Sequence, residues 1–443
     1  MTQQTASGAR AQVYVEVTTT LAARFTAGYE RLVRNVLAGL DDPDAPVEVV
    51  PVVAKGRNGH RRLTDSEREQ LAHHPAGGSN SRRADRFGPL SPLVRATVGL
   101  RVVGRARAAA ANQRRRLMTS PSVRALDLGI LPMGSVWLDL EPAWNDPDPR
   151  PELLARLQAE GIHSAVLVAD VMPEIHPDWF DGHQREVFGD WLQAHLEHSG
   201  LFLCISHNTE ADLREVARRR GIARELPTVV VPLGADLPDA TPEPVHMPPE
   251  VGRYMLVVGT LEPRKNQKLV LDAFDRLRLR HEDLGLVLVG RQGWMVDELA
   301  ESIRTHPDFG GRLVWPDAVS DGQLAWLYRH AFLTVAPSRY EGLGVPVMEA
   351  LGYGSPTISS TGGALSEAGG DHVETIDPDD LDGLCVAIER HLMDDDHHND
   401  LQQKASTYVA PRWDDTAVVV GAALQRLATE PPPMPGRMTG GSA

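Results

Sequence analysis

The sequence predicts an α/β protein of two Rossmann-like domains, each with a parallel sheet, facing each other across a cleft. In the C-terminal half, short apolar runs alternate with helical patterns such as residues 266–280. Apolar strands that alternate with helices indicate a parallel sheet covered on both faces. The strands expected there are Tyr254–Val258, Leu286–Val289, Arg312–Trp315, Phe332–Ala336 and Pro356–Ser359.

The N-terminal half shows the same alternation less regularly. Six short β-branched or apolar runs predict its strands: Val13–Val17, Val47–Val52, Ser135–Leu138, Ala165–Val168, Leu201–Ile205 and Val229–Val231. Two domains of this kind are the simplest arrangement that accounts for both halves.

A proline-rich segment at residues 238–250 sets the expected domain boundaries. We expect an N-terminal domain at 12–237, with a basic insertion at about 55–120, and a C-terminal domain at 251–411. Helical spacing predicts one more helix within 412–430. The ends, residues 1–11 and 431–443, are expected to be disordered.

Composition excludes several classes of protein. No run of about 18 apolar residues occurs, and the N-terminus has no apolar signal core, which favours a cytoplasmic protein. The formal net charge of −15 is not typical of a nucleic-acid binder. Cys204 and Cys385 are expected to be buried, and no Cys/His cluster has the spacing of metal ligands, so no metal site is expected.

The basic insertion carries 15 basic and only four acidic residues between Lys55 and Arg116. Within it, valines alternate with arginines over residues 93–118. One hypothesis is an amphipathic helix that lies on an anionic membrane surface and brings the protein to a lipid-linked partner. The alternative is a solvated helix with one face on the N-terminal domain.

The most informative motif lies at residues 338–351. An apolar strand ends at Pro337-Ser338, a loop with Gly342, Leu343 and Gly344 follows, and Pro346 stands where a helix should begin. Such glycines let backbone N–H groups approach a ligand, and a helix N-terminus favours anions. We expect Glu341 in the loop and Glu349 in the first helical turn to face one small volume, suited to phosphates and hydroxyls. A nucleotide sugar fits that description.

This segment resembles the donor-binding signature of the retaining family 4 glycosyltransferases, which have the GT-B fold. In that family the first Glu contacts the transferred sugar and the second contacts the donor ribose, which implies these roles for Glu341 and Glu349. Residues 258–266, Val-Gly-Thr-Leu-Glu-Pro-Arg-Lys-Asn, resemble a mannosyltransferase-like branch of the family. The resemblance extends from about Ala165 to Leu427 and implies that the final helix returns to the N-terminal domain.

Arg264 and Lys265 follow a strand that ends at Gly259 and precede a helix, which places two cations at the ligand-binding edge of the sheet. In metal-free GT-B enzymes, cations and backbone amides stabilise the leaving diphosphate. The resemblance therefore implies a metal-independent reaction without a cofactor, in which both residues act on the donor. Many relatives have Arg where this chain has Thr260, and Arg264 is expected to supply that charge.

Further candidates come from both halves. Gly28, in a segment that resembles the family's first glycine turn, is expected to open a helix toward the diphosphate. Glu367 matches a family position near the donor. Asp170 and His176 follow a strand end that faces the cleft, where Asp170 is expected to bind acceptor hydroxyls or to stabilise positive charge on the sugar. His176 is either an acceptor ligand or a structural histidine.

The expected function is therefore transfer of a hexose from a nucleotide diphosphate sugar to a glycan or lipid-linked acceptor, with retention. By resemblance the hexose is mannose, with GDP-mannose favoured over UDP- or dTDP-sugars. The alternatives are another GT-B enzyme that acts on nucleotide sugars, such as an epimerase or a natural-product glycosyltransferase, and a catalytically silent nucleotide-sugar-binding protein.

Overall fold

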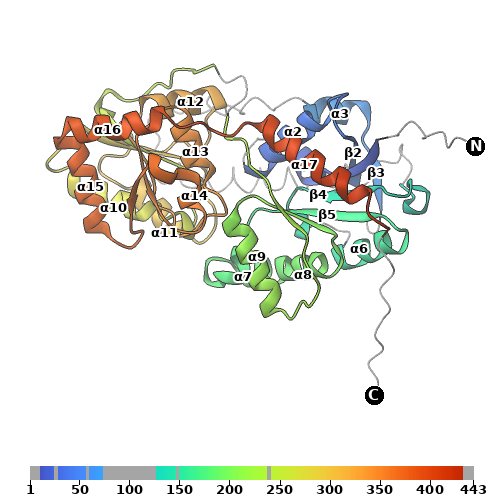
Figure 1. Ribbon diagram of the computed structural model, residues 1–443. Coiled ribbons are helices and arrows are strands. Elements are labelled where there is room, and N and C mark those ends of the chain that lie inside the picture. Colours follow the sequence, from blue (N-terminus) through green and yellow to red (C-terminus); the bar gives the residue numbers. More distant parts are fainter. Residues whose placement is uncertain are drawn as a thin grey trace, which may run out of the picture.

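A computed structural model describes residues 10–23, 28–55, 59–72, 126–145, 149–236 and 241–432. The molecule has two lobes, each an α/β layer structure (Figure 1). The segments coloured blue to green and the red C-terminal helix form one lobe, and the segments coloured yellow to orange-red form the other. Residues 93–118, for which a membrane-surface helix was one hypothesis, lie outside the described residues, as do residues 1–9 and 433–443 at the ends expected to be disordered. Ala11, expected within the disordered N-terminus, instead begins the first strand and pairs with Val47.

The N-terminal domain has a seven-stranded sheet in the order β3-β2-β1-β4-β5-β6-β7, parallel except for the antiparallel edge pair β2–β3. Its strands are β1 Ala11–Glu16, β2 Val47–Ala54, β3 His60–Arg62, β4 Val136–Asp139, β5 His163–Val168, β6 Leu201–Cys204 and β7 Thr228–Val230. Its helices include α1 Thr18–Ala22, α2 Gly28–Leu40, α3 Asp65–Ala72, α6 Arg150–Ala159, α7 Met172–Ile175, α8 Gly182–His198 and α9 His207–Arg219.

The C-terminal domain has a six-stranded parallel sheet in the order β10-β9-β8-β11-β12-β13. Its strands are β8 Arg253–Val258, β9 Leu284–Val289, β10 Leu313–Val314, β11 Leu333–Ala336, β12 Thr357–Ser360 and β13 Glu374–Ile376. Its helices are α10 Gln267–Leu277, α11 Asp297–Arg304, α12 Asp321–His330, α13 Val345–Gly352, α14 Leu365–Gly369, α15 Leu381–Met393 and α16 Asp395–Ser406. Two parallel, doubly wound sheets confirm the predicted fold class.

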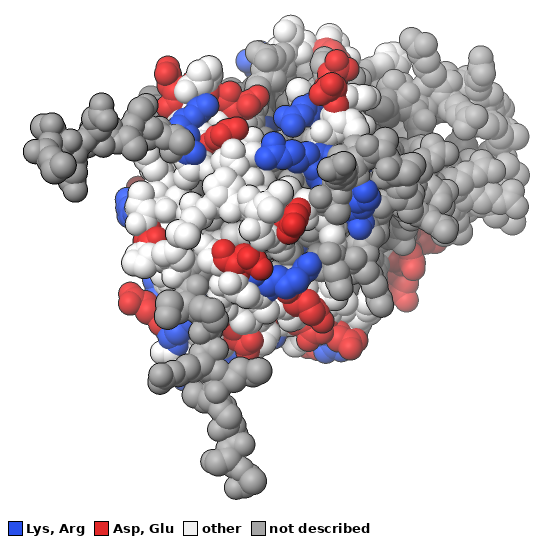
Figure 2. Space-filling view, turned by 90° about the vertical axis from the view of Figure 1, so that its right-hand side faces the viewer, with Lys and Arg blue, Asp and Glu red and all other residues white. Residues whose placement is uncertain are grey.

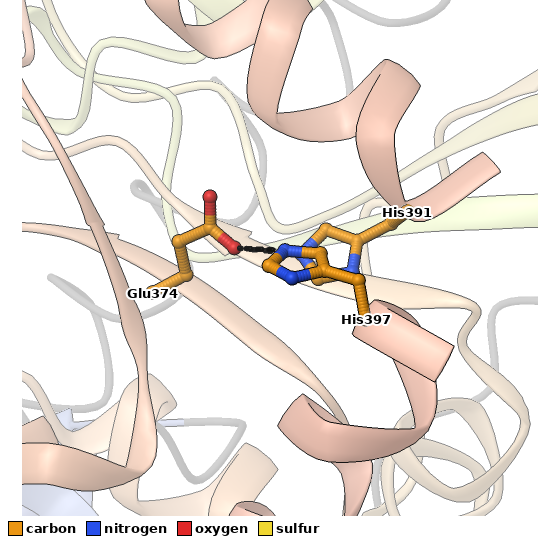
Figure 3. A group of neighbouring side chains, drawn as sticks. All are labelled: Glu374, His391 and His397. Atoms are coloured by element: carbon orange, nitrogen blue, oxygen red, sulfur yellow. Dashed lines mark hydrogen bonds and ion pairs between the residues drawn. The ribbon is translucent and has the colours of Figure 1, made fainter. Parts of the chain in front are cut away.

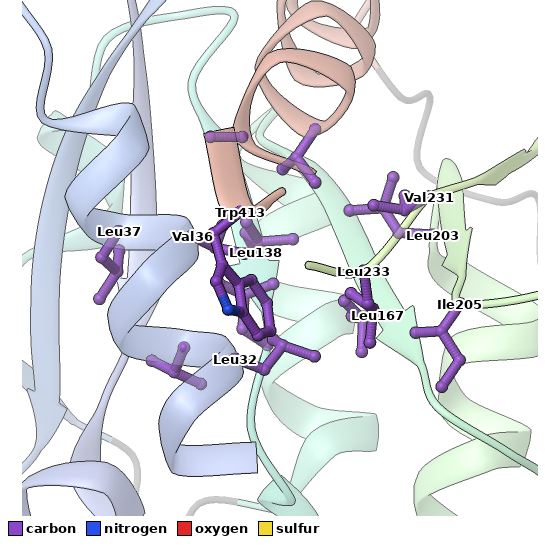
Figure 4. Close-up of a cluster of buried hydrophobic side chains, with 14 of the residues drawn as sticks. Leu32, Val36, Leu37, Leu138, Leu167, Leu203, Ile205, Val231, Leu233 and Trp413 are labelled. Atoms are coloured by element: carbon purple, nitrogen blue, oxygen red, sulfur yellow. The ribbon is translucent and has the colours of Figure 1, made fainter. Parts of the chain in front are cut away.

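The last helix, α17 Trp413–Ala428, lies against the N-terminal domain beside α2 (Figure 1). Trp413 enters the same buried cluster as Val36 of α2 and Leu138 of β4 (Figure 4). The helices approach closely at Gly39, where an added Cβ would lie 2.4 Å from the Cβ of Ala417. A chain that ends in this way crosses between the domains twice, so their separation is limited by two covalent connections.

Part of the basic insertion belongs to the fold. Residues 59–72 supply β3, at the sheet edge, and α3. Arg61 has no exposed surface and forms an ion pair with Glu67 (Nη2 to Oε1, 2.7 Å), so this arginine does not contribute to a surface patch. On the face drawn in Figure 2, acidic and basic side chains of the described residues are interspersed. No helix among the described residues has the length and apolar character needed to cross a membrane.

Both cysteines, Cys204 in β6 and Cys385 in α15, are buried and free, as the sequence predicted. Burial raises the pKa of the Cys204 thiol to about 12, so this side chain is an inert part of the core.

Candidate functional site

The candidate site lies where the strand order of the C-terminal sheet reverses. β8 and β11 are neighbours, but the chain continues from β8 to β9 on one side and from β11 to β12 on the other. The loops after the carboxyl ends of these two strands therefore diverge and leave a crevice, which is where open α/β sheets bind ligands. One loop begins at Gly259 and the other at Pro337.

A cluster of two cations around one carboxylate joins these loops. Glu341 accepts from Nη1 of Arg264 through Oε2 at 2.5 Å, and its Oε1 lies 2.6 Å from Nζ of Lys265. The hydroxyl of Ser338 donates to the same Oε1 at 2.6 Å. All three charged side chains have little exposed surface, so the attraction between them is screened only weakly.

The opposite charges in this cluster shift the pKa values of Glu341 and Arg264 in opposite directions. Burial alone would raise the pKa of Glu341, but Arg264 and Lys265 lower it to about 2. Burial lowers and Glu341 raises the pKa of Arg264, with a net rise. Glu262, whose Oε1 is 3.1 Å from Nη2 of Arg264, has its pKa raised by burial. These shifts favour the charged forms of both Arg264 and Glu341.

Asn266 fixes the geometry of the cationic loop. It adopts a left-handed conformation, with φ of 54° and ψ of 32°, between the short helical turn Pro263–Lys265 and α10. Asn is one of the few residues other than Gly that tolerate this region. Its side-chain amide donates to the carbonyl oxygens of Pro337 and Pro378, and the Arg339 amide donates to the carbonyl of Arg264. The two loops are therefore held together by backbone contacts.

Glycines let the second loop approach its neighbours closely. An added Cβ at Gly342 would lie 2.0 Å from the carbonyl oxygen of Ala169 in the N-terminal domain. The Gly342 carbonyl accepts from the hydroxyls of Ser206 and Thr209, at 2.6 and 3.1 Å, also across the domain boundary. Gly344 precedes α13 with φ of 98°, a conformation that favours glycine. This loop therefore forms part of the domain interface.

Glu349 is the fifth residue of α13, in its second turn rather than its first. Its Oε1 accepts from Nη1 of Arg31 at 2.6 Å, and its Oε2 accepts from the hydroxyl of Tyr328 at 2.9 Å. Glu341 and Glu349 were expected to face one small volume, but each has its own set of partners. Burial raises the pKa of Glu349, and Arg31 opposes that shift.

Asp170 and His176, the candidate acceptor-binding residues, follow strand β5 of the N-terminal domain. Oδ1 of Asp170 accepts from the Met172 amide at 3.0 Å. Burial raises the pKa of Asp170, and the charge of Arg264 across the interface opposes the rise. An added Cβ at Gly342 would lie 3.1 Å from the Cβ of Asp170, so Asp170 lies beside the loop that carries Glu341.

His176 belongs to an aromatic group that spans both domains. Its ring stacks on Trp179 at 4.1 Å between centroids and lies 4.8 Å from the ring of Tyr340. Nε1 of Trp294 donates to the Trp179 carbonyl at 2.8 Å. Burial lowers the pKa of His176, which favours the neutral imidazole. The His176 ring is therefore packed between side chains of both domains.

Glu367 and Gly28 occupy the borders of the site. The Glu367 carboxylate accepts from the backbone amides of His207 and Asn208, at 2.9 and 2.7 Å, and so caps α9 of the other domain. Gly28 is the first residue of α2, with φ of 41° and open space where a Cβ would stand. Leu343 is buried in the core that continues into the N-terminal domain.

The structure adds several residues that sequence reasoning missed. Arg31 of the N-terminal domain pairs with both Glu349 and Asp321 of the C-terminal domain. The Tyr328 hydroxyl donates to the second oxygen of Glu349, and the Ser338 hydroxyl donates to Glu341. Arg31 lies three residues after Gly28, in the segment that resembles the family's first glycine turn. That position was the available signal for Arg31. Tyr328 had none, because its helix reads as an ordinary amphipathic helix.

A family model matches part of the C-terminal half of the chain. Residues 243–408 match the family model of glycosyl transferases group 1. The chain is 31% identical over 259 residues to the serotype-specific mannosyltransferase WbdA of Escherichia coli, an alignment covering 55% of this chain and 32% of that protein. It is 37% identical over 146 residues to the O-antigen chain mannosyltransferase B of Escherichia coli, covering 32% of this chain and 37% of the relative. The chain thus spans about a third of the length of these relatives.

Solved structures resemble the whole chain in fold. Sucrose-phosphate synthase from Thermosynechococcus elongatus superposes with a TM-score of 0.56 at 18% identity, covering 94% of this chain and 97% of the other. Anabaena HepE in complex with UDP and glucose gives a TM-score of 0.57 at 13% identity, covering 94% and 98%. At these identities the likeness establishes the shared two-domain fold.

Proposed function

We propose that this chain, which belongs to the GT-B glycosyltransferases through the group 1 domain at residues 243–408, transfers mannose from GDP-mannose to a glycan or lipid-linked acceptor. The transfer retains the anomeric configuration and needs neither cofactor nor metal ion. The observation that carries this proposal is the cluster of Arg264, Lys265 and Glu341 at the strand reversal of the C-terminal sheet.

The two cations suit a leaving diphosphate. Breaking the glycosidic bond leaves negative charge on the phosphate oxygen, and cations fixed beforehand stabilise that charge without reorganisation. Arg264 offers a planar fork of N–H donors and Lys265 a compact charge. In the donor-free protein Glu341 neutralises part of this charge, so donor phosphates compete with Glu341 for the same two side chains.

The carboxylates then take separate roles. Glu341, released in part from the cations, is positioned to hold hydroxyls of the transferred sugar. Glu349 binds the ribose hydroxyls in place of Arg31. Asp170 lies on the facing wall, where it accepts from an acceptor hydroxyl. Its raised pKa is consistent with a group that shares a proton during the transfer.

Mannose as the transferred sugar is supported by the two Escherichia coli relatives, both named as mannosyltransferases. A third relative, the phosphatidyl-myo-inositol mannosyltransferase of Mycolicibacterium smegmatis, is 31% identical over 204 residues and covers 45% of this chain. Its name indicates a lipid acceptor, which supports keeping lipid-linked acceptors in the proposal.

The test is a donor screen with the full chain after treatment with EDTA and gel filtration. GDP-mannose, UDP-glucose and a dTDP-sugar are incubated with mannosides and with a lipid-linked acceptor, and nucleoside diphosphate release is measured. We expect release from GDP-mannose that depends on an acceptor, and an α-linked product by NMR. Turnover only with a uridine or thymidine sugar, a β-linked product, or activity that returns only with manganese or magnesium would each contradict part of the proposal.

A further inference from the structure

Three side chains of the kinds that bind metal ions converge at the edge strand of the C-terminal sheet, two strands away from β11 of the candidate site. Glu374 begins the outermost strand β13, His391 lies in the last turn of α15, and His397 lies in the first turn of α16. Both imidazoles point their Nε2 atoms at Oε2 of Glu374, at distances of 3.0 and 2.9 Å (Figure 3). The ligand atoms all lie within 4.8 Å of one another.

The arrangement is a convergence on one point rather than a chain of hydrogen bonds. In a proton relay, one imidazole would donate to the next group in line. Here both rings offer the same kind of nitrogen to the same oxygen, and the ring centroids of His391 and His397 are 4.4 Å apart. Two nitrogens and one oxygen around a shared centre are the ligand set of a His₂Glu metal site.

The distances also suit a small ion. Zinc lies about 2.0–2.2 Å from nitrogen and oxygen ligands in tetrahedral sites, which separates neighbouring ligand atoms by about 3.3–3.5 Å. The two nitrogen–oxygen distances therefore need to open by only about half an ångström to admit an ion.

The surroundings leave a path for the ion and for a fourth ligand. His391 has no exposed surface, whereas the side chains of His397 and Glu374 are 29% and 21% exposed. The cluster is therefore buried on the side of His391 and accessible to solvent on the side of His397 and Glu374. Asp394, Asp395 and Asp396 precede His397 and add negative charge nearby.

We propose that Glu374, His391 and His397 bind one divalent transition-metal ion of the zinc class, with a solvent molecule as fourth ligand. This site departs from the expectation that the chain holds no metal. Ligand spacing could not reveal this site, because the carboxylate comes from a separate strand. The proposal is independent of the donor site, which lies at β8 and β11.

The ion would have a structural effect. It joins the edge strand β13 to the turn between α15 and α16, and α16 leads into the segment that crosses to α17 in the other domain. Fixing this turn therefore stabilises the start of the interdomain connection. Chemistry on a substrate is not part of the proposal.

The experiment uses tag-free, full-length protein freed of metal with a chelator. Zinc is titrated by calorimetry, cobalt by visible absorption, and the Tm is measured with and without zinc. The variants are Glu374→Gln and His397→Gln, at partly exposed positions. The matched control is His398→Gln, because His398 is adjacent and stacks on Phe332 at 4.3 Å, and its ring meets His391 only edge-on, at 5.6 Å between centroids.

We expect one zinc ion per chain, a rise in Tm on adding zinc, and the absorption of four-coordinate cobalt. Glu374→Gln and His397→Gln should weaken zinc binding by at least about tenfold, since even loss of an outer-sphere partner costs that much. His398→Gln should bind as the natural protein does. No stoichiometric binding to the natural protein would overturn the proposal, as would equal weakening by all three variants, which would indicate unspecific binding to surface histidines.

Discussion

Arg31 of the N-terminal domain donates from Nη1 to Oε1 of Glu349 in the C-terminal domain at 2.6 Å. Its Nη2 reaches Oδ1 of Asp321 at 2.7 Å, so one side chain bridges α2, α12 and α13. Side chains of Arg31 and Glu349 have 13% and 5% of their surface exposed, which makes this a largely buried ion pair between the lobes. In the proposed reaction the donor ribose takes the place of Arg31 at Oε1 of Glu349.

Replacing Arg31 should therefore make donor binding easier. In Arg31→Gln the ribose hydroxyls no longer displace a buried ion pair, and we expect GDP to bind roughly fivefold more tightly, about 1 kcal/mol. Calorimetric titration with GDP measures this. Arg276→Gln is the control, because it breaks an exposed ion pair with Asp382 inside one domain. Weaker GDP binding by Arg31→Gln would show that Arg31 itself contacts the nucleotide.

The sequence predicted the fold well, because strand and helix patterns are local. β8, β9, β11 and β12 lie where apolar runs were found, and Pro346 is in the first turn of α13. The sequence also placed Arg264 and Lys265 at the ligand-binding edge of the sheet, and the 338–351 loop after another strand of the same sheet. It could not predict that Glu349 pairs with Arg31, 318 residues away. Contacts between domains depend on how the two lobes pack, for which a single sequence carries no periodic signal.

Gly342 should be intolerant of any side chain. A methyl group there would overlap the Ala169 carbonyl, at 2.0 Å, and would push the domains apart. Gly342→Ala should reduce kcat/KM about a hundredfold, as expected for a displacement of about 1 Å in a catalytic arrangement. Steady-state kinetics measures the loss, and small-angle X-ray scattering should show a larger radius of gyration.

The control for that variant is Gly311→Ala, because an added Cβ there would meet only the Asp308 carbonyl at 3.5 Å. It should leave both kinetics and scattering unchanged. A Gly342→Ala protein with natural kcat/KM would mean that the interface at Ala169 does not form during the reaction.

Glu341 should link stability to pH in the acid range. Its pKa is about 2 in the folded protein, below the ordinary value of 4.5, so folding favours the ionised form. The contribution is fully present above pH 4.5 and is lost as the pH falls toward 2, with a size of roughly 3 kcal/mol. The difference in unfolding free energy between the natural protein and Glu341→Gln should therefore be constant from pH 8 to 5 and shrink below it. Denaturant titrations over this range measure it, and a difference that grows below pH 4.5 would reverse the assigned sign.

Glu367→Gln should separate a structural role from a donor-binding role. The carboxylate caps the N-terminus of α9 through the amides of His207 and Asn208, and weakening such a cap costs about 0.5–1 kcal/mol. We expect a lower Tm with an unchanged GDP affinity. If the Tm stays the same while GDP affinity falls, Glu367 contacts the donor, as the family resemblance implies.

The central claim is that Arg264 and Lys265 hold the donor diphosphate, and calorimetry of GDP against Lys265→Ala tests it most directly. Lys268→Ala is the matched control, because Lys268 lies three residues further along the chain, in α10, is 68% exposed and pairs only with Asp272 among the described contacts. Losing a hydrogen bond between charged groups costs about 1.5–3 kcal/mol, so Lys265→Ala should bind GDP at least about tenfold more weakly. Lys268→Ala should bind it as the natural protein does. Equal GDP affinity in the natural protein and Lys265→Ala would contradict the account.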